Sequence, residues 1–198
     1  MDYSNRNDLQ YSKELLETTQ FNPTETLESI MNEYGSEIKR LVYSYIKNPC
    51  DADDVTQEVF VTVYRKLHTF KGKSTLRSWV YAIAINKCKD YLRNWKVRNI
   101  MLKGRLEQYL KTTDYPNTPE QHILGKIEEK QLLNQVLSLP IKYREVIILF
   151  YFVEFSVNEI ADSLSINQNT VRTRLNRGRR KLKNIIESKR GGDLWINN

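Results

Sequence analysis

Apolar residues recur every three or four positions along most of the chain, and no stretch shows the strict alternation of a half-buried strand. In the first half, this spacing predicts helices over about 24–47, 52–70 and 76–96. In the second half, it predicts helices over about 119–137 and 140–153. Glycine and proline, which punctuate strands and turns, number only 7 and 5. The expected fold class is therefore all-α.

Between residues 156 and 182 the pattern predicts two helices joined by a tight turn. Ser156 and Glu159 have the spacing of a capping box at the start of the first helix, and Asn167 suits the N-cap of the second. One face of the second helix is apolar or small: Val171, Leu175, Gly178, Leu182 and Ile185. A short helix, a turn and a second helix with a basic outer face are typical of a helix-turn-helix, whose second helix enters the major groove of DNA.

Positive charge is concentrated on this second helix. From Ile166 to Arg190 there are nine basic residues and one acid, Glu187. A helix that is merely solvated would mix signs, because like charges four residues apart repel. A phosphate backbone removes that repulsion, so the pattern favours nucleic-acid binding over a solvated charged face.

The formal charge of +7 is also unevenly divided along the chain. Residues 1–60 hold twelve acids and five bases, whereas the remainder holds twelve acids and twenty-six bases. An acidic beginning and a basic remainder indicate two kinds of partner, a basic protein surface and a nucleic acid.

The segment 112–121 contains two prolines among Thr, Asn and Asp residues, a composition that favours a spacer over a helix. We therefore expect two small helical domains joined by a flexible linker. The expected divisions are an N-terminal extension at 1–23, a first domain at 24–100, a linker at 101–122, a helix-turn-helix domain at 123–190 and a tail at 191–198.

No metal or cofactor is expected. Cys50 and Cys88 have no Cys or His at metal-motif spacing, and neither His68 nor His122 has a metal-binding context. Two distant thiols indicate a reducing cytoplasm, and the polar N-terminus predicts no signal peptide. The longest apolar run, 146–153, is too short to span a bilayer, so we expect a cytoplasmic protein without membrane insertion.

Three segments resemble parts of one family, the bacterial sigma-70 factors, and in particular their small extracytoplasmic-function (ECF) group. Residues 51–65 (DADDVTQEVFVTVYR) look like the polymerase-binding helix of sigma domain two. Residues 70–93 (FKGKSTLRSWVYAIAINKCKDYLR) look like the loop and helix that open the promoter, and 139–183 resembles sigma domain four. The resemblance covers about residues 25–186, with the motifs in the family's order across a linker.

The resemblance implies a protein that binds core RNA polymerase, recognises the minus-35 and minus-10 promoter elements and promotes melting of the DNA. It implies no catalytic group in this chain, because polymerase supplies the nucleotide chemistry. Asp53, Asp54, Gln57 and Glu58 would then dock on the coiled coil of the largest polymerase subunit, while domain four would meet the flap. Without the resemblance, these acids are better explained as compensating the helix dipole.

For the minus-10 element, the resemblance implies that the loop 70–75 holds a base flipped out of the duplex and that the following helix lines the non-template strand. The implied residues are Lys71, Lys73, Ser74, Arg77, Tyr81, Asn86, Lys87 and Arg93.

For the minus-35 element, the second helix of the helix-turn-helix would read duplex DNA. Arginine can fork onto guanine and asparagine onto adenine. The implied residues are Arg172, Thr173, Arg174, Asn176, Arg177 and Arg180, with Arg174 and Arg180 assigned to phosphate or polymerase rather than to bases. The family usually works under an anti-sigma factor, often membrane-bound, and such a partner is expected here.

The sequence also admits two alternatives. A stand-alone helix-turn-helix regulator would need a dimerisation surface and leaves the domain-two motif unexplained. An enzyme acting on DNA would need an activated nucleophile or a carboxylate metal cluster, but Asp51, Asp53 and Asp54 begin a helix and lack further ligands. The chain departs from the family in its longer extension before residue 24. Asn176 also stands where relatives vary, so the minus-35 sequence does not follow.

Overall fold

The computed structural model describes the backbone of residues 22–106 and 127–193, and side chains within 22–95 and 131–188. Over these ranges it is helical without a strand, which confirms the all-α prediction. The elements are α2 (Pro23–Ile46), α3 (Pro49–Lys66), the 3-10 helix η1 (Leu67–Thr69), α4 (Leu76–Leu106), α5 (Ile127–Ser138), α6 (Ile141–Tyr151), α7 (Val157–Leu164) and α8 (Gln168–Asp193). None of these helices is both long enough and apolar enough to cross a membrane.

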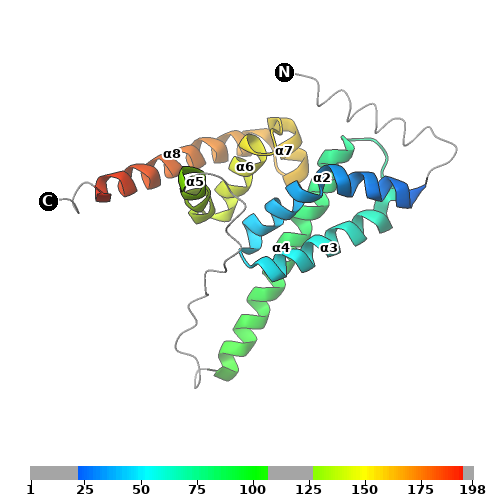
Figure 1. Ribbon diagram of the computed structural model, residues 1–198, viewed down its shortest axis with the longest axis horizontal. Helices are drawn as coiled ribbons and strands as arrows, with labels where there is room; N and C mark the ends of the chain where they lie inside the picture. The colour runs from blue at the N-terminus through cyan, green and yellow to red at the C-terminus, as the bar shows by residue number, and fades with distance from the viewer. Residues whose placement is uncertain (1–21, 107–126, 194–198) are drawn as a thin grey trace.

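Helices α2, α3 and α4 pack on one another and form what we call the N-terminal group (Figure 1). Their apolar stripes meet in a core that includes Ile38, Val42, Val59, Val63 and Ile85, all without exposed surface. The periodic apolar positions of the sequence are therefore the positions that the fold buries.

The first two helices begin earlier than the sequence suggested. Asn22 caps α2, and its Oδ1 accepts the Thr24 N–H at 3.1 Å. Asn48 caps α3 and accepts the N–H of Asp51 at 3.3 Å. The asparagine is extended, as a residue before proline prefers, and the proline then serves as the first helical residue, where its missing N–H costs nothing.

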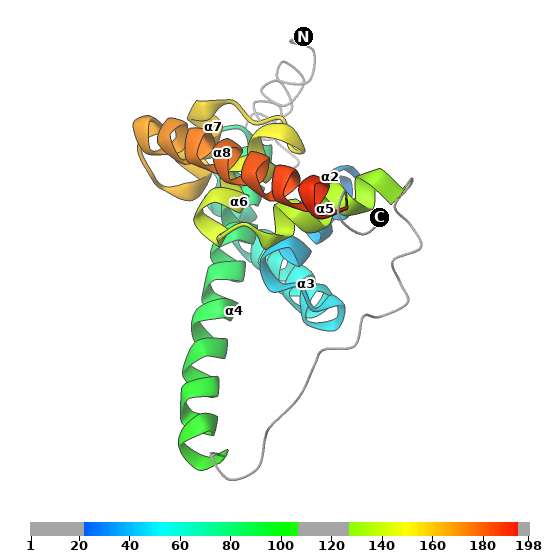
Figure 2. The same ribbon diagram turned by 90° about the vertical axis from the view of Figure 1, so that its left-hand side faces the viewer.

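Helix α4 is longer than predicted. It continues to Leu106, although the apolar pattern predicted its end at about residue 96, and the first residues assigned to the linker, 101–106, are helical. No proline interrupts residues 97–106, and helix formers such as Met, Leu, Lys and Arg dominate there. The extra turns carry α4 away from the other helices (Figure 2). The rest of the predicted linker lies outside the described residues.

Helices α5 to α8 form the C-terminal group. Within it, the predicted capping box is present, since Ser156 Oγ accepts the Glu159 N–H at 3.2 Å and Glu159 Oε2 accepts the Ser156 N–H at 2.9 Å. Ser165 ends α7 with a left-handed φ of 54°. Asn167 then receives the Thr170 N–H at 2.7 Å, as expected of the cap that starts α8. The helix-turn-helix is therefore formed as predicted.

A glycine lets α8 approach α6 closely. A Cβ on Gly178 would stand 3.1 Å from Cγ1 of Ile147, which is tighter than about nine in ten real Cβ contacts, so Ile147 would have to shift. Val171 and Leu175 continue the same contact face and are buried. Helix α6 thus fixes the rotation of α8 about its axis and decides which residues face outward.

The two groups are packed together. Helix α7 lies against α4 (Figures 1 and 2), and the buried apolar side chains of both groups form one continuous cluster. The sequence left the relative placement of the two helical units open, and the structure places them in contact.

Candidate nucleic-acid and polymerase interfaces

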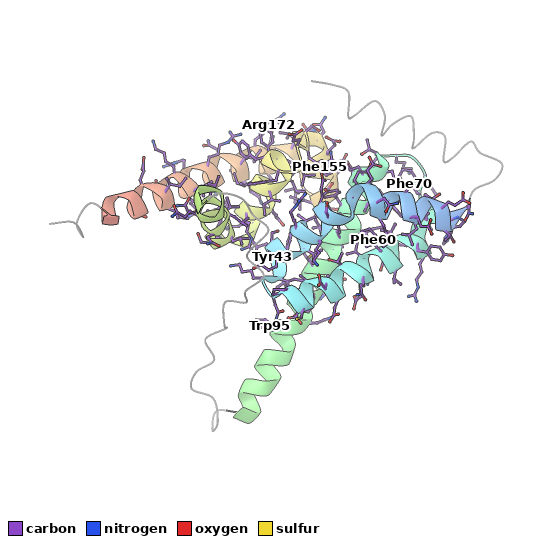
Figure 3. The ribbon with its side chains drawn as sticks, viewed as in Figure 1. Tyr43, Phe60, Phe70, Trp95, Phe155 and Arg172 are labelled. Atoms are coloured by element: carbon purple, nitrogen blue, oxygen red, sulfur yellow. The ribbon has the colours of Figure 1, made fainter. Side chains whose placement is uncertain are left out.

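The outer face of α8 collects five of the six residues predicted for the minus-35 element. These are Arg172, Thr173, Asn176, Arg177 and Arg180, all exposed. Arg172 stands at the outer edge of the molecule (Figure 3). We call these five residues the α8 outer face.

Arg174, the sixth residue, points the other way. Its Nη1 donates to Glu145 Oε1 of α6 at 2.8 Å, and the Glu145 side chain is only 5% exposed. Arg174 is two residues from Arg172, and two residues turn a helix by slightly more than half a revolution. The guanidinium therefore ties α8 to α6 in this structure.

A cation and two aromatic rings meet on the surface between α6 and α8. The Arg179 guanidinium lies over the rings of Phe150 and Tyr151 at 5.5 and 5.6 Å, and its Nε donates to the Tyr151 hydroxyl at 2.7 Å. The sequence pattern contains no signal for the aromatic pair that lies beneath Arg179.

The loop before α4 has exposed basic residues and is held in place by an aromatic contact. Lys71 and Lys73 are exposed and Ser74 is half-buried, while Gly72 adopts the positive φ of 63° that its lack of a side chain permits. The loop is anchored by Phe70, whose ring centroid lies 5.4 Å from that of Trp79. The loop could therefore present its two lysines to phosphates without losing its shape.

Arg77 and Tyr81, on the first turns of α4, are held by a residue that sequence reasoning missed. Glu37 of α2 accepts from Arg77 Nη2 at 3.2 Å and from the Tyr81 hydroxyl at 2.5 Å. Tyr81 has no exposed surface, and its pKa is raised above its ordinary value by burial and by Glu37. The pattern of α2 contains no signal for this role, because Glu37 only follows from the way α2 crosses α4.

Farther along α4 the predicted strand-binding residues lie near its surface. Asn86 and Arg93 are exposed, and Arg93 pairs with Asp90 at 2.9 Å. Lys87 Nζ lies 3.6 Å from Glu58 Oε2 on α3. This ion pair places the predicted DNA-binding helix directly beside the predicted polymerase-binding helix.

The predicted polymerase-binding residues share one side of α3. Asp54, Gln57 and Glu58 are exposed, and Asp53 beside them pairs with Lys39 of α2 at 2.7 Å. Spacings of three and four residues bring such side chains together on a helix. The result is a surface able to meet a basic partner.

Besides the shared apolar cluster, the two groups meet through a few specific side-chain contacts. The Tyr45 hydroxyl donates to Glu145 Oε2 at 3.0 Å, and burial followed by the charge of Glu145 raises the tyrosine pKa. The Ser163 hydroxyl reaches the backbone carbonyl of Ser78 at 3.4 Å. Beside α7, Phe155 packs on Tyr81 with ring centroids 4.9 Å apart. We call these six residues the closing interface.

Metal binding and thiol chemistry have little support in the part of the chain that the structure describes. It contains no cluster of three or more His, Cys, Asp or Glu residues that could hold a metal ion. Cys50 is exposed, whereas burial raises the pKa of the Cys88 thiol to about 12. Cys88 therefore remains protonated in the folded protein at neutral pH.

Comparison with known families assigns both groups. Residues 30–97 match Sigma-70 region 2, and residues 129–182 match Sigma-70, region 4. Together the two matches cover more than half of the chain, in the order and positions of the N-terminal and C-terminal groups.

Individual relatives agree. The chain is 31% identical over 159 residues to the ECF RNA polymerase sigma factor SigW of Bacillus subtilis, covering 78% of this chain and 85% of the relative. It is 30% identical over 151 residues to the RNA polymerase sigma factor SigV of the same bacterium, covering 76% and 85%.

Two solved structures share the fold. The first is CnrH in complex with the cytosolic domain of CnrY, with a TM-score of 0.63, 22% identity, and coverage of 91% of this chain and 97% of that one. The second is the sigma factor RpoE of Bartonella quintana in complex with the anti-sigma factor NepR, with a TM-score of 0.67, 18% identity, and coverage of 82% and 98%.

Proposed function

The chain belongs to the extracytoplasmic-function group of the sigma-70 family, and on this premise we propose which of its surfaces carries each step of transcription initiation. An ECF sigma factor joins core RNA polymerase, recognises promoter DNA and initiates transcription. The stand-alone regulator considered from the sequence is wrong, because the N-terminal group is region 2 of a sigma factor and not an unrelated helical domain.

The α8 outer face reads the minus-35 duplex. Its arginines and asparagine are exposed side by side on a helix whose rotation is fixed by Gly178 and whose start is fixed by Asn167. Arg172 and Arg177 have the donors for guanine, and Asn176 has the donor and acceptor for adenine. Arg174 acts differently, because its pairing with Glu145 holds α8 at the right angle without reaching a base.

The loop 70–75 and α4 bind the minus-10 element as an open single strand. Extruding a base costs about a few kcal/mol, which stacking and edge contacts in the loop recover. Lys71 and Lys73 meet phosphates, and Asn86, Lys87 and Arg93 continue the path of the strand along α4. Binding only the open form is enough to shift the duplex equilibrium toward melting.

The acidic side of α3 docks on the polymerase. Asp54 and Glu58 are exposed and close to the strand-binding path, as the Glu58–Lys87 pair shows. Opposite charges on the coiled coil of the largest subunit would speed association and fix its register more than they add affinity. The C-terminal group meets the flap of the polymerase.

The chain itself performs no catalysis in this scheme, because polymerase supplies the chemistry, and it works in the cytoplasm beside the polymerase. CnrH and RpoE were solved with CnrY and NepR, respectively. By analogy, we expect an anti-sigma protein, soluble or membrane-anchored, to restrain this chain.

The test is gel filtration of the chain with bacterial core RNA polymerase that lacks any sigma factor, without DNA. The observation behind it is the exposed acidic side of α3. Co-elution is expected for the wild type and should be lost in the double variant Asp54→Lys and Glu58→Lys. The matched control, Glu28→Lys and Glu33→Lys, makes the same charge change at exposed positions of α2 and should still co-elute.

Equal loss in both double variants would mean that net charge, not a docking surface, drives association. A wild-type chain that never co-elutes, and gives no run-off transcript with polymerase, would contradict the proposed function.

A further inference from the structure

The closing interface covers part of the surface that the proposed function assigns to the single strand. Tyr81 has no exposed surface, and Arg77 is largely covered, with 17% of its side chain exposed. The residue that covers them, Phe155, comes from the C-terminal group and is itself buried (Figure 3).

Phe155 covers these two residues, with its ring tilted on Tyr81 rather than stacked in parallel. Its ring centroid lies 4.9 Å from that of Tyr81, with the planes inclined by 55°. The Arg77 guanidinium lies 5.2 Å from the Phe155 ring centroid and 5.7 Å from that of Tyr81. Aromatic faces with neighbouring guanidinium groups are the platforms on which single-stranded bases stack.

We propose that Phe155 occupies the place of a nucleobase on Tyr81 and Arg77, so that the C-terminal group competes, within the same chain, with the single-stranded minus-10 DNA. The proposal rests on the proposed function of α4. In the free chain the part of the strand-binding surface formed by Arg77 and Tyr81 is then closed, and full binding of the strand requires the two groups to separate at the closing interface.

The polar contacts of the closing interface permit such separation without leaving a buried charge unpaired. Glu145 loses the Tyr45 hydroxyl on opening but keeps Arg174 of its own group. Tyr81 loses Phe155 but keeps Glu37 of α2. A buried charge that loses its partner is strongly destabilising, and here each carboxylate retains one.

The remaining contacts are ones that water can replace. The Ser163 hydroxyl and the Ser78 carbonyl, 3.4 Å apart, both become hydrated when the groups part. Opening is opposed by the apolar side chains that α4 and α7 share in one cluster, and a base packed on Tyr81 would restore the part of this contact that Phe155 makes. The interface can therefore exchange one ring for another.

The experiment measures opening and strand binding in the same free chain. Cys50 is exposed and Cys88 is buried, so a second exposed cysteine, Asn184→Cys, gives one labelling position on each group for fluorescence energy transfer. The opening variant is Ser163→Glu, which places a charge where the hydroxyl meets Ser78. The matched control is Asn158→Glu, the same change at an exposed position of the same helix.

Strand binding is measured with a fluorescent single-stranded DNA of random sequence, because stacking and phosphate contacts tolerate any sequence. We expect the wild type and Asn158→Glu to show high energy transfer and weak binding. Ser163→Glu should show lower transfer and about tenfold tighter binding, the gain expected if about one chain in ten is open in the wild type. Phe155→Leu, which keeps an apolar side chain but removes the ring, should bind more tightly as well.

Two outcomes would overturn the inference. One is a wild type with energy transfer as low as that of Ser163→Glu, since the groups would then already be apart. The other is an opened Ser163→Glu chain, with a helical spectrum like the wild type, that binds the strand no better.

Failure of the proposed function looks different. If Ser163→Glu opens and neither chain binds the strand at all, the assignment of Arg77 and Tyr81 to DNA is wrong, and the competition falls with it. Normal run-off transcription by that same chain would then separate a wrong strand site from a wrong family function.

Discussion

The two proposed DNA-binding surfaces of this sigma factor differ in how accessible they are to DNA in the free chain. The α8 outer face is exposed, and two of its residues contact Asn169 of their own helix, Arg172 at 3.3 Å and Thr173 at 2.8 Å. The start of α4 is covered, with Tyr81 buried under Phe155 and bonded to Glu37. A surface that reads duplex DNA can stay exposed in the free protein, whereas a stacking surface is apolar enough to be covered by another part of the chain.

Glu145 links the two surfaces, and we expect its substitution to have the largest effect on stability. Its carboxylate accepts from Tyr45 of the N-terminal group and from Arg174 of α8. In Glu145→Gln the buried pair is broken, and we expect the free energy of unfolding to fall by about 3 kcal/mol, the low end for a buried pair because Arg174 is partly exposed. Urea denaturation measures this loss.

The control for this change is Glu187→Gln, the same substitution in the exposed pair with Lys183 at 3.6 Å. It should change the free energy of unfolding by less than about 0.5 kcal/mol. A Glu145→Gln chain as stable as this control would show that Glu145 links nothing, and the two surfaces would then be independent.

Two basic residues of α8, Arg177 and Lys181, should contribute to DNA binding in different ways. Arg177→Ala should cost about 1–3 kcal/mol of binding, or about 5- to 150-fold, on duplexes that carry its preferred base, and much less on others. Lys181→Ala, at an exposed position beside Tyr143, should weaken all duplexes evenly and reduce the salt slope by about one unit. Fluorescence anisotropy on a set of minus-35 duplexes separates the two patterns.

Equal losses for both variants on every duplex would show that the α8 outer face holds phosphates only. Base selectivity would then have to come from elsewhere in the chain or from the polymerase. The exposed face would in that case be a docking surface and no longer a reading surface.

The buried thiol of Cys88 on α4 should make the free energy of unfolding fall at alkaline pH. Burial raises the pKa of Cys88 to about 12, from an ordinary value of 9.0. Between these values the thiol is ionised in the unfolded chain but not in the folded one. Unfolding therefore releases a proton, and stability is lost as pH rises above about 9, at up to about 1.4 kcal/mol per pH unit. Below pH 9 the thiol is protonated in both states, and its contribution to stability is constant.

Urea denaturation between about pH 9 and 9.5 tests this, a window in which ordinary tyrosines, with a pKa of about 10, remain mostly protonated. Cys88→Ala should flatten the fall in stability with pH, whatever it does to stability at neutral pH. Cys50→Ala removes a thiol that is in water in the folded state and should keep the wild-type slope. A slope unchanged by Cys88→Ala would mean that another group is responsible.

The exposed α8 outer face was more predictable from the sequence than the covered start of α4, because the contacts that position it are local. The capping box of Ser156 and Glu159, the cap at Asn167 and the apolar face of α8 all depend on residues three or four positions apart. Periodicity also identified which helices form. It could not find the end of α4. Helix formers continue beyond residue 96 without an apolar stripe, so the apolar pattern does not indicate where the helix ends.

The covered start of α4 and the closing interface depend on contacts between residues far apart in the chain. Tyr45 meets Glu145 at a separation of 100 residues, and Tyr81 meets Glu37 at 44. The resemblance assigned Arg174 to phosphate or polymerase, but its partner in this structure is Glu145 in another helix. No local pattern specifies such pairs, and they follow only from the packing of the helices.

The smallest effect is expected from two glycines that lie inside helices, one in each group. A Cβ on Gly35 of α2 would meet nothing within 4 Å, whereas one on Gly178 of α8 would press on Ile147 at 3.1 Å. Gly35→Ala should therefore raise the free energy of unfolding by about 0.5–1 kcal/mol, the gain of alanine over glycine within a helix. In Gly178→Ala the same gain is opposed by overpacking against α6, which typically costs about 1–3 kcal/mol, so this variant should be no more stable than the wild type. Thermal and urea denaturation of both variants measure the difference. A Gly178→Ala chain as stabilised as Gly35→Ala would show that α6 does not hold α8 tightly, and the fixed rotation that presents Arg172 and Arg177 outward would lose its physical basis.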